Sequence, residues 1–144
     1  MSLKIEQVHK YFVGEVSGID LSDPLSKSEV TQIEEGMDQF GVLIFREQFL
    51  SDEEQVSYTK NFGELELHVG SNVLKGNERR LSLEFADVSN LDQDGEILKK
   101  GDRRRMFNLG NRLWHTDSSF RNIPSKFSIP VSYTHLRAHE TRSD

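Results

Sequence analysis

The sequence predicts an α+β fold, with capped helices early in the chain and strand-forming segments later. Three observations support this prediction. Apolar residues recur every three or four positions in two stretches before residue 64. Each stretch starts with a serine that is followed three residues later by a glutamate, the pattern of a capping box. After residue 80 the segments are richer in strand-forming residues, which favours a β-sandwich or barrel for the later part.

The first helix is predicted in the segment "SKSEVTQIEEGMDQFG". Ser26 and Glu29 form its capping box, and Gly41 supplies the residue at which helices commonly end. The apolar stripe of this helix consists of Val30, Ile33, Met37 and Phe40. The next segment, "GVLIFRE", is short and largely apolar, so we expect a strand that is buried on both faces.

The second helix is predicted in "SDEEQVSYTKNFG", where Ser51 and Glu54 form another capping box and Gly63 ends the helix. Its predicted apolar side carries Val56, Thr59 and Phe62. The signal then weakens. "ELELHVGSNVLKGNERR" reads as the start of a strand followed by a loop rich in glycine and asparagine.

The later segments predict strands separated by one charged loop. "LSLEFADVSN" alternates well enough for a strand, and "LDQDGEILKKGDRRR" is expected to be the loop. Strand-forming residues return at the end of "MFNLGNRLWHTDSSF" and again in "PSKFSIP". Arg103, Arg104 and Arg105 are expected to lie in a solvated loop, with the alternative that they steer an anionic substrate.

Composition limits the class of protein. The 144 residues suit about one domain, and 35% apolar with 29% charged residues suits a globular chain. The net charge of −6 argues against bulk attraction to nucleic acid or to an anionic membrane. The absence of cysteine excludes disulfides, thiolate metal sites and cysteine nucleophiles. The N-terminus has no apolar signal region and no segment approaches membrane-spanning length, so we expect a cytoplasmic protein.

The last fourteen residues, 131–144, differ from those before them. They continue neither helical nor strand periodicity. "VSYTHLRAHET" resembles the in-frame translation of a transposase adaptor used in sequencing libraries, and the alternative is a genuine polar tail. We therefore expect a domain portion in residues 1–130 and a non-native read-through tail in residues 131–144. On this interpretation His135 and His139 are not candidate metal ligands.

The segment "RLWHTDSSF" contains His115 and Asp117, two residues apart. On a strand these side chains point to the same face, so an imidazole and a carboxylate would lie side by side. One further histidine would complete the two-histidine, one-carboxylate triad that holds Fe(II) and leaves three coordination positions open. Trp114 and Phe120 would help to keep water away from such a centre.

Other interpretations of this segment remain open on spacing alone. His-x-Asp also occurs by chance on surface strands, and zinc would accept the same two ligands. A serine hydrolase is a weaker alternative, because the chain has no G-x-S-x-G elbow.

The wider sequence resembles a known family. "NRLWHTDSSF" resembles the metal-binding motif of the TauD/TfdA family of Fe(II)/α-ketoglutarate-dependent dioxygenases. "GVLIFREQFLSDEEQVSYTKNFGELE" is similar to the family's N-terminal strand, helix and "FG" turn. "EFADVSNLDQDGEILKKGDRRR" is similar to the stretch that precedes the metal motif in the chlorophenoxyacetate dioxygenase branch. The resemblance extends from about Val13 to Pro130.

The resemblance implies the N-terminal part of a double-stranded β-helix, or jelly roll, truncated and flanked by N-terminal helices. It implies that His115 and Asp117 are catalytic metal ligands, two of the three that bind iron. His68 and Asn111 match positions near the substrate, with the alternatives of a surface residue for His68 and a turn residue for Asn111. Trp114 is expected to be a core aromatic residue.

The activity implied is hydroxylation of a small anionic substrate, with Fe(II) as cofactor, α-ketoglutarate as co-substrate, and succinate and CO₂ as products. The partners expected are O₂ and an aryloxyalkanoate, sulfonate or alkyl sulfate. The third iron ligand and the arginine that pairs with α-ketoglutarate would lie beyond Pro130. The alternatives are an inactive jelly-roll binding module and an inactive gene fragment, and a homo-oligomer stays open.

Overall fold

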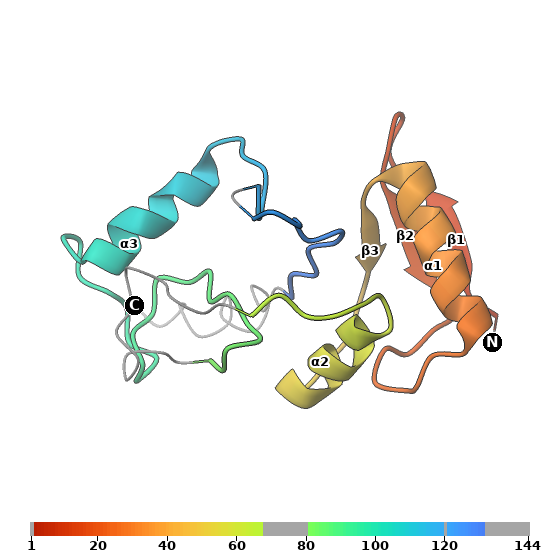
Figure 1. The fold of residues 1–144 in the computed structure, drawn as a ribbon, viewed down its shortest axis with the longest axis horizontal. Helices are drawn as coiled ribbons and strands as arrows, with labels where there is room; N and C mark the ends of the chain where they lie inside the picture. The colour runs from red at the N-terminus through yellow and green to blue at the C-terminus, as the bar shows by residue number, and fades with distance from the viewer. Residues whose placement is uncertain (1, 68–80, 120, 132–144) are drawn as a thin grey trace, which may run out of the picture. The chain divides into compact units, whose positions relative to one another are not determined.

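The structure is a computed structural model that describes residues 2–67, 81–119 and 121–131. The chain divides into two compact units, Met1–Leu67 and His68–Asp144 (Figure 1). Among the described residues, every helix falls short of the length and apolar character needed to cross a membrane.

The first unit contains a three-stranded sheet in the order β1-β2-β3 (Figure 1). The strands are β1 (Lys4–Gln7), β2 (Gly14–Ser17) and β3 (Leu43–Phe45). β1 pairs antiparallel with β2, and β2 pairs parallel with β3. A parallel pair needs a long connection, and helix α1 (Lys27–Phe40) provides it. The predicted strand in "GVLIFRE" is confirmed, but its three residues are half-buried rather than buried on both faces.

Helix α1 begins and ends where the sequence predicts. Both hydrogen bonds of the Ser26–Glu29 capping box are present, and Gly41 adopts the left-handed conformation with φ of 69°. The buried residues of the helix are Ile33, Gly36 and Phe40. The predicted stripe is thus buried at two of its four positions, and Val30 and Met37 are half-buried.

Two glycines allow α1 to pack closely on the sheet. A Cβ atom at Gly36 would lie 2.5 Å from Cδ1 of Ile5 on β1. A Cβ atom at Gly14 on β2 would lie 2.7–2.9 Å from the side chains of Ile5, Phe40 and Leu43. These contacts leave no room for a methyl group at Gly14 without movement of three neighbours.

Helix α2 (Asp52–Lys60) has the predicted Ser51–Glu54 capping box and ends at Asn61, before Gly63. Its buried side chain is Tyr58, which the predicted apolar side omitted. The Tyr58 ring packs edge-on between Phe45 and Phe62, with centroid distances of 6.0 and 5.3 Å. Burial raises the pKa of the Tyr58 hydroxyl. Packing against Phe45 of the sheet therefore determines which side of α2 is buried. The helical period alone did not predict that side.

The second unit contains one regular helix, α3 (Arg103–Asn108), among its described residues, followed by the 3₁₀ turn η2 (Leu109–Arg112). The prediction of a solvated loop at Arg103–Arg105 is wrong, because these residues open α3. Asp102 caps the helix, and its carboxylate pairs with the Arg104 guanidinium at 3.0 Å. The Asp102 pKa is lowered, chiefly by the hydrogen bond from the Arg104 side chain.

The strands predicted in "LSLEFADVSN", at the end of "MFNLGNRLWHTDSSF" and in "PSKFSIP" do not form in the described residues. The described part of this unit has one isolated antiparallel bridge, between Leu91 and Ile97. A strand needs a partner for its backbone N–H and C=O groups, and alternation within one segment does not supply that partner.

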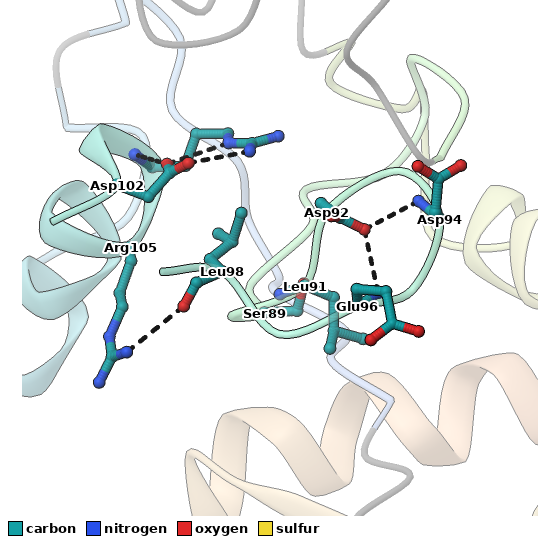
Figure 2. Close-up of polar contacts among 9 residues, drawn as sticks. Ser89, Leu91, Asp92, Asp94, Glu96, Leu98, Asp102 and Arg105 are labelled. Atoms are coloured by element: carbon teal, nitrogen blue, oxygen red, sulfur yellow. Dashed lines mark hydrogen bonds and ion pairs between the residues drawn. The ribbon is translucent and has the colours of Figure 1, made fainter. Parts of the chain in front are cut away.

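Hydrogen bonds organise the loop that carries this bridge (Figure 2). Oδ1 of Asp92 accepts from the backbone N–H groups of Asp94 and Glu96, each at 2.9 Å. The backbone carbonyl of the buried Leu98 accepts from Nη1 of Arg105 at 3.4 Å. Further along α3, Nδ2 of Asn108 donates to the Ser89 carbonyl at 2.6 Å. These bonds attach α3 to the loop that precedes it, and α3 leads through η2 to the His-x-Asp segment.

Candidate metal centre

His115 and Asp117 lie side by side in a loop that follows η2. The predicted strand is absent here, because residues 114–116 have no regular structure and residues 117–119 form a turn. The two side chains nevertheless meet, with Nε2 of His115 3.1 Å from Oδ1 of Asp117. They are 46% and 60% exposed, so the pair is accessible in this chain. The predicted proximity is confirmed, and the reason given for it is wrong.

The backbone carbonyl of Leu113 orients the His115 ring. Nδ1 lies 2.8 Å from the Leu113 carbonyl oxygen, which can only accept a hydrogen bond. Nδ1 therefore carries a proton, and a neutral ring then presents a lone pair at Nε2. The bond to Leu113 is the main cause that raises the pKa of His115, and the neighbouring Asp117 carboxylate also raises it. A lone pair at Nε2 facing a carboxylate oxygen calls for a proton or a cation between them.

The Asp117 carboxylate uses its two oxygens differently. Oδ1 faces His115, whereas Oδ2 accepts from Oγ of Ser128 at 2.8 Å. The turn after Asp117 includes Ser118 at a φ of 53°, and the Arg121 N–H donates to the Ser118 carbonyl at 2.9 Å. This turn brings the chain back so that a residue eleven positions later reaches Asp117.

The donor atoms suit a divalent cation. Ligand bonds to such ions are about 2.1 Å long, so two ligands at right angles lie about 3.0 Å apart. The 3.1 Å between Nε2 and Oδ1 is close to that separation. The Leu113 carbonyl is also the kind of outer partner that orients a metal-binding histidine. No cluster of three such ligand residues occurs in the part of the chain that the structure describes. The pair therefore supplies two ligands of a site, and a complete set needs more.

The remaining predicted site residues have mixed outcomes. Asn111 lies in η2, four residues before His115, and this placement leaves its predicted substrate role untested. Trp114 is fully exposed, so the expectation of a core aromatic residue is wrong for this chain. His68 falls outside the described residues, as do Phe120, His135 and His139.

Sequence reasoning missed two groups that orient the pair, the Leu113 carbonyl and the Ser128 hydroxyl. A backbone carbonyl leaves no trace in the sequence. Ser128 lies within a segment predicted to be a strand, and neither its spacing nor its chemistry distinguishes it from the chain's other serines.

Comparison with known proteins identifies the family of this chain. The family described as "Taurine catabolism dioxygenase TauD, TfdA family" matches residues 4–129. The chain belongs to this family. The match extends over parts of both units and covers the His-x-Asp segment.

Curated relatives in the TauD/TfdA family include two α-ketoglutarate-dependent 2,4-dichlorophenoxyacetate dioxygenases. The protein from Burkholderia sp. (strain RASC) is 38% identical over 132 residues, which cover 90% of this chain and 43% of the relative. The protein from Cupriavidus pinatubonensis is 37% identical over 132 residues, which cover 90% of this chain and 45% of the relative. The chain thus spans less than half the length of these relatives.

Among solved structures, the chain is similar to AAD-2 in complex with Mn(II) and N-oxalylglycine. The two are 47% identical, with a TM-score of 0.81 over 88% of this chain and 44% of that one. At this identity the likeness concerns sequence as well as fold.

Proposed function

We propose that this chain is the N-terminal part of a non-haem Fe(II), α-ketoglutarate-dependent dioxygenase. The observation that carries the proposal is the His115–Asp117 pair, whose donor atoms lie 3.1 Å apart within a TauD/TfdA-family match. The names of the relatives support α-ketoglutarate as co-substrate. N-oxalylglycine, bound with Mn(II) in AAD-2, differs from α-ketoglutarate by an NH in place of a methylene group and supports the same assignment.

In this proposal the whole protein completes a jelly roll around the metal. The described residues of the second unit expose many large apolar side chains, including Phe107, Leu113, Trp114 and Ile123. We infer that further protein covers these side chains in the whole protein. The strands that would pair with the segments after residue 80 belong to that further protein.

The protein's own residues hold and orient the metal in this proposal. His115 would bind through Nε2 because the Leu113 carbonyl holds the proton on Nδ1. Asp117 would bind through Oδ1 and neutralise part of the metal's charge. Bound iron with α-ketoglutarate supplies the power to oxidise a C–H bond with O₂, releasing succinate and CO₂. A third protein ligand would come from outside the described residues.

The substrate we propose is a small organic anion, and an aryloxyalkanoate is favoured within that class. The two curated relatives described above are named for 2,4-dichlorophenoxyacetate, an aryloxyalkanoate. Sulfonates and alkyl sulfates share the anionic group and stay in the proposal as alternatives. Asn111 lies in η2, four residues before His115, and its substrate role is proposed from the family resemblance. His68 is proposed for the same role from the family resemblance alone.

The test is Fe(II)-dependent conversion of α-ketoglutarate to succinate by the whole protein, with 2,4-dichlorophenoxyacetate as substrate. Asp117→Ala removes the anionic ligand, and losing even an outer-shell partner costs about 10–100-fold, so we expect a loss beyond about a hundredfold. Asp94→Ala is the matched control, because it removes a carboxylate that is exposed in the same unit (Figure 2). Full activity in Asp117→Ala contradicts the proposal, and inactivity of the unmodified protein favours a binding module instead.

A further inference from the structure

We propose that Ser128 is a positioning residue that fixes the Asp117 carboxylate for metal binding. This inference rests on the proposed function, because it assumes that Asp117 is a metal ligand. Oγ of Ser128 donates to Oδ2 of Asp117 at 2.8 Å, while Oδ1 remains directed at His115. The hydroxyl thus engages the carboxylate oxygen that does not face the histidine.

A carboxylate needs such a partner because its terminal torsion is loosely defined. Rotation about the bond to the carboxyl carbon has broad, roughly two-fold minima, so either oxygen can turn toward a metal. A hydrogen bond on Oδ2 selects one orientation and leaves Oδ1 for the metal. The orientation matters more here because Asp117 is 60% exposed and packing does little to hold it.

The two ligands then have matching supports. The Leu113 carbonyl holds the far nitrogen of the His115 ring, and the Ser128 hydroxyl holds the far oxygen of Asp117. In each case the atom away from the partner ligand is fixed, and the atoms that face each other are 3.1 Å apart. Outer partners of this kind typically change metal affinity about 10–100-fold when they are removed.

A purely structural role for Ser128 is the competing explanation. The bond spans eleven residues and closes a loop, and Oγ atoms of Ser118 and Ser125 also approach within 3.4 Å across the same loop. A loop tie would affect the stability of the metal-free protein. The loss of a positioning residue would weaken metal affinity, and another side chain with a hydroxyl group at that position would restore it.

The experiment titrates the whole protein, of which this chain is the proposed N-terminal part, with Mn(II) and measures the free ion by electron paramagnetic resonance. Four variants accompany it: Ser128→Ala, Ser128→Thr, Ser125→Ala and Asp117→Ala. We expect Asp117→Ala to lose the specific binding and Ser128→Ala to weaken it about tenfold. Ser128→Thr keeps the hydroxyl and should restore most of the affinity. Ser125→Ala, the matched control from the same loop, should bind like the unmodified protein. Metal-free melting temperatures should be similar for Ser128→Ala and Ser125→Ala.

The outcomes separate this inference from the proposed function. Unchanged affinity in Ser128→Ala, with loss in Asp117→Ala, overturns the positioning role and leaves the metal site in place. A melting temperature that falls in Ser128→Ala, with weak binding that Ser128→Thr does not restore, shows a loop tie and also overturns it. Equal binding, or equal lack of binding, by the unmodified whole protein and its Asp117→Ala variant overturns the metal assignment itself.

Discussion

The two units differ in what holds them together. In the first unit, six apolar side chains are buried around the sheet and its helices: Val16, Leu21, Ile33, Phe40, Leu50 and Tyr58. In the described part of the second unit, Leu98 alone is buried to that degree. Hydrogen bonds that the Asp92 carboxylate accepts and that the Arg105 and Asn108 side chains donate organise that unit instead. Figure 2 shows those of Asp92 and Arg105.

This difference bears on the candidate metal centre, because both of its described ligands, His115 and Asp117, belong to the second unit. His115 and Asp117 are placed by a carbonyl, a hydroxyl and a turn rather than by a packed sheet. Hydrogen bonds at exposed positions contribute less net free energy than buried apolar contacts do. Core substitutions in the first unit should therefore lower the free energy of unfolding strongly. Substitutions in the second unit should mainly change metal binding.

The largest expected contrast is between two phenylalanines. Phe40→Ala removes a side chain that is 8% exposed and packs on the sheet, so it should lower the free energy of unfolding by about 3–5 kcal/mol. Phe107→Ala, the matched substitution in α3, removes a side chain that is 67% exposed and should change the free energy by less than about 0.5 kcal/mol. Urea unfolding followed by circular dichroism measures both. Equal losses in the two variants would mean that the units are not packed differently.

A smaller contrast comes from two glycines. Gly14→Ala places a methyl group within 2.9 Å of three side chains, and such overpacking should cost about 1–3 kcal/mol. Gly101→Ala, in the second unit, meets nothing within 4 Å and should be neutral or stabilising by about 0.4–1 kcal/mol. The same urea measurements compare the pair. If Gly14→Ala proves as stable as the unmodified chain, the close approach of α1 to the sheet is not maintained in solution.

The smallest expected effect concerns the capping box of α1. Ser26→Ala should cost about 1 kcal/mol at neutral pH, because it removes an N-cap hydroxyl. Hydrogen bonds from the Ser26 side chain and backbone lower the pKa of Glu29 in the folded state. A lowered pKa stabilises the fold above the ordinary glutamate range, and this contribution disappears as pH falls through the lowered pKa. The difference between Ser26→Ala and the unmodified chain should therefore shrink in acid.

Ser28→Ala is the control for that prediction, because Ser28 lies on the exposed side of the same helix and does not cap it. Thermal unfolding from pH 7 to pH 3 measures all three proteins. A difference that stays constant or grows toward low pH would contradict the assigned role of Glu29.

The sequence predicted the parts of the fold that local interactions determine. Both capping boxes were predictable, because each helix start lies within four residues of sequence. β1 and β2 were not predicted, since each has four residues and forms through pairing with other segments. The prediction of which side of α2 is buried was wrong for a similar reason, because Tyr58 packs on Phe45 of the sheet.

The candidate site was predicted in part, and for an incorrect geometric reason. The two-residue spacing identified His115 and Asp117 as candidate ligands. The structure places them side by side without the strand that was expected. Trp114 was expected in a core because it is a large aromatic residue, yet it is exposed in this chain. Ser128 was missed because a contact between residues eleven positions apart depends on a turn that the sequence does not signal clearly.

The most direct test of the account is where a paramagnetic ion binds on the whole protein. Mn(II) at substoichiometric concentration broadens the backbone amide signals nearest to its site in a nuclear magnetic resonance spectrum. We predict that broadening centres on His115 to Asp117 and Ser128, and that it is lost in Asp117→Ala. Broadening that centres instead on the acidic loop of Asp92, Asp94 and Glu96, or that persists unchanged in Asp117→Ala, would contradict the assignment of the metal centre.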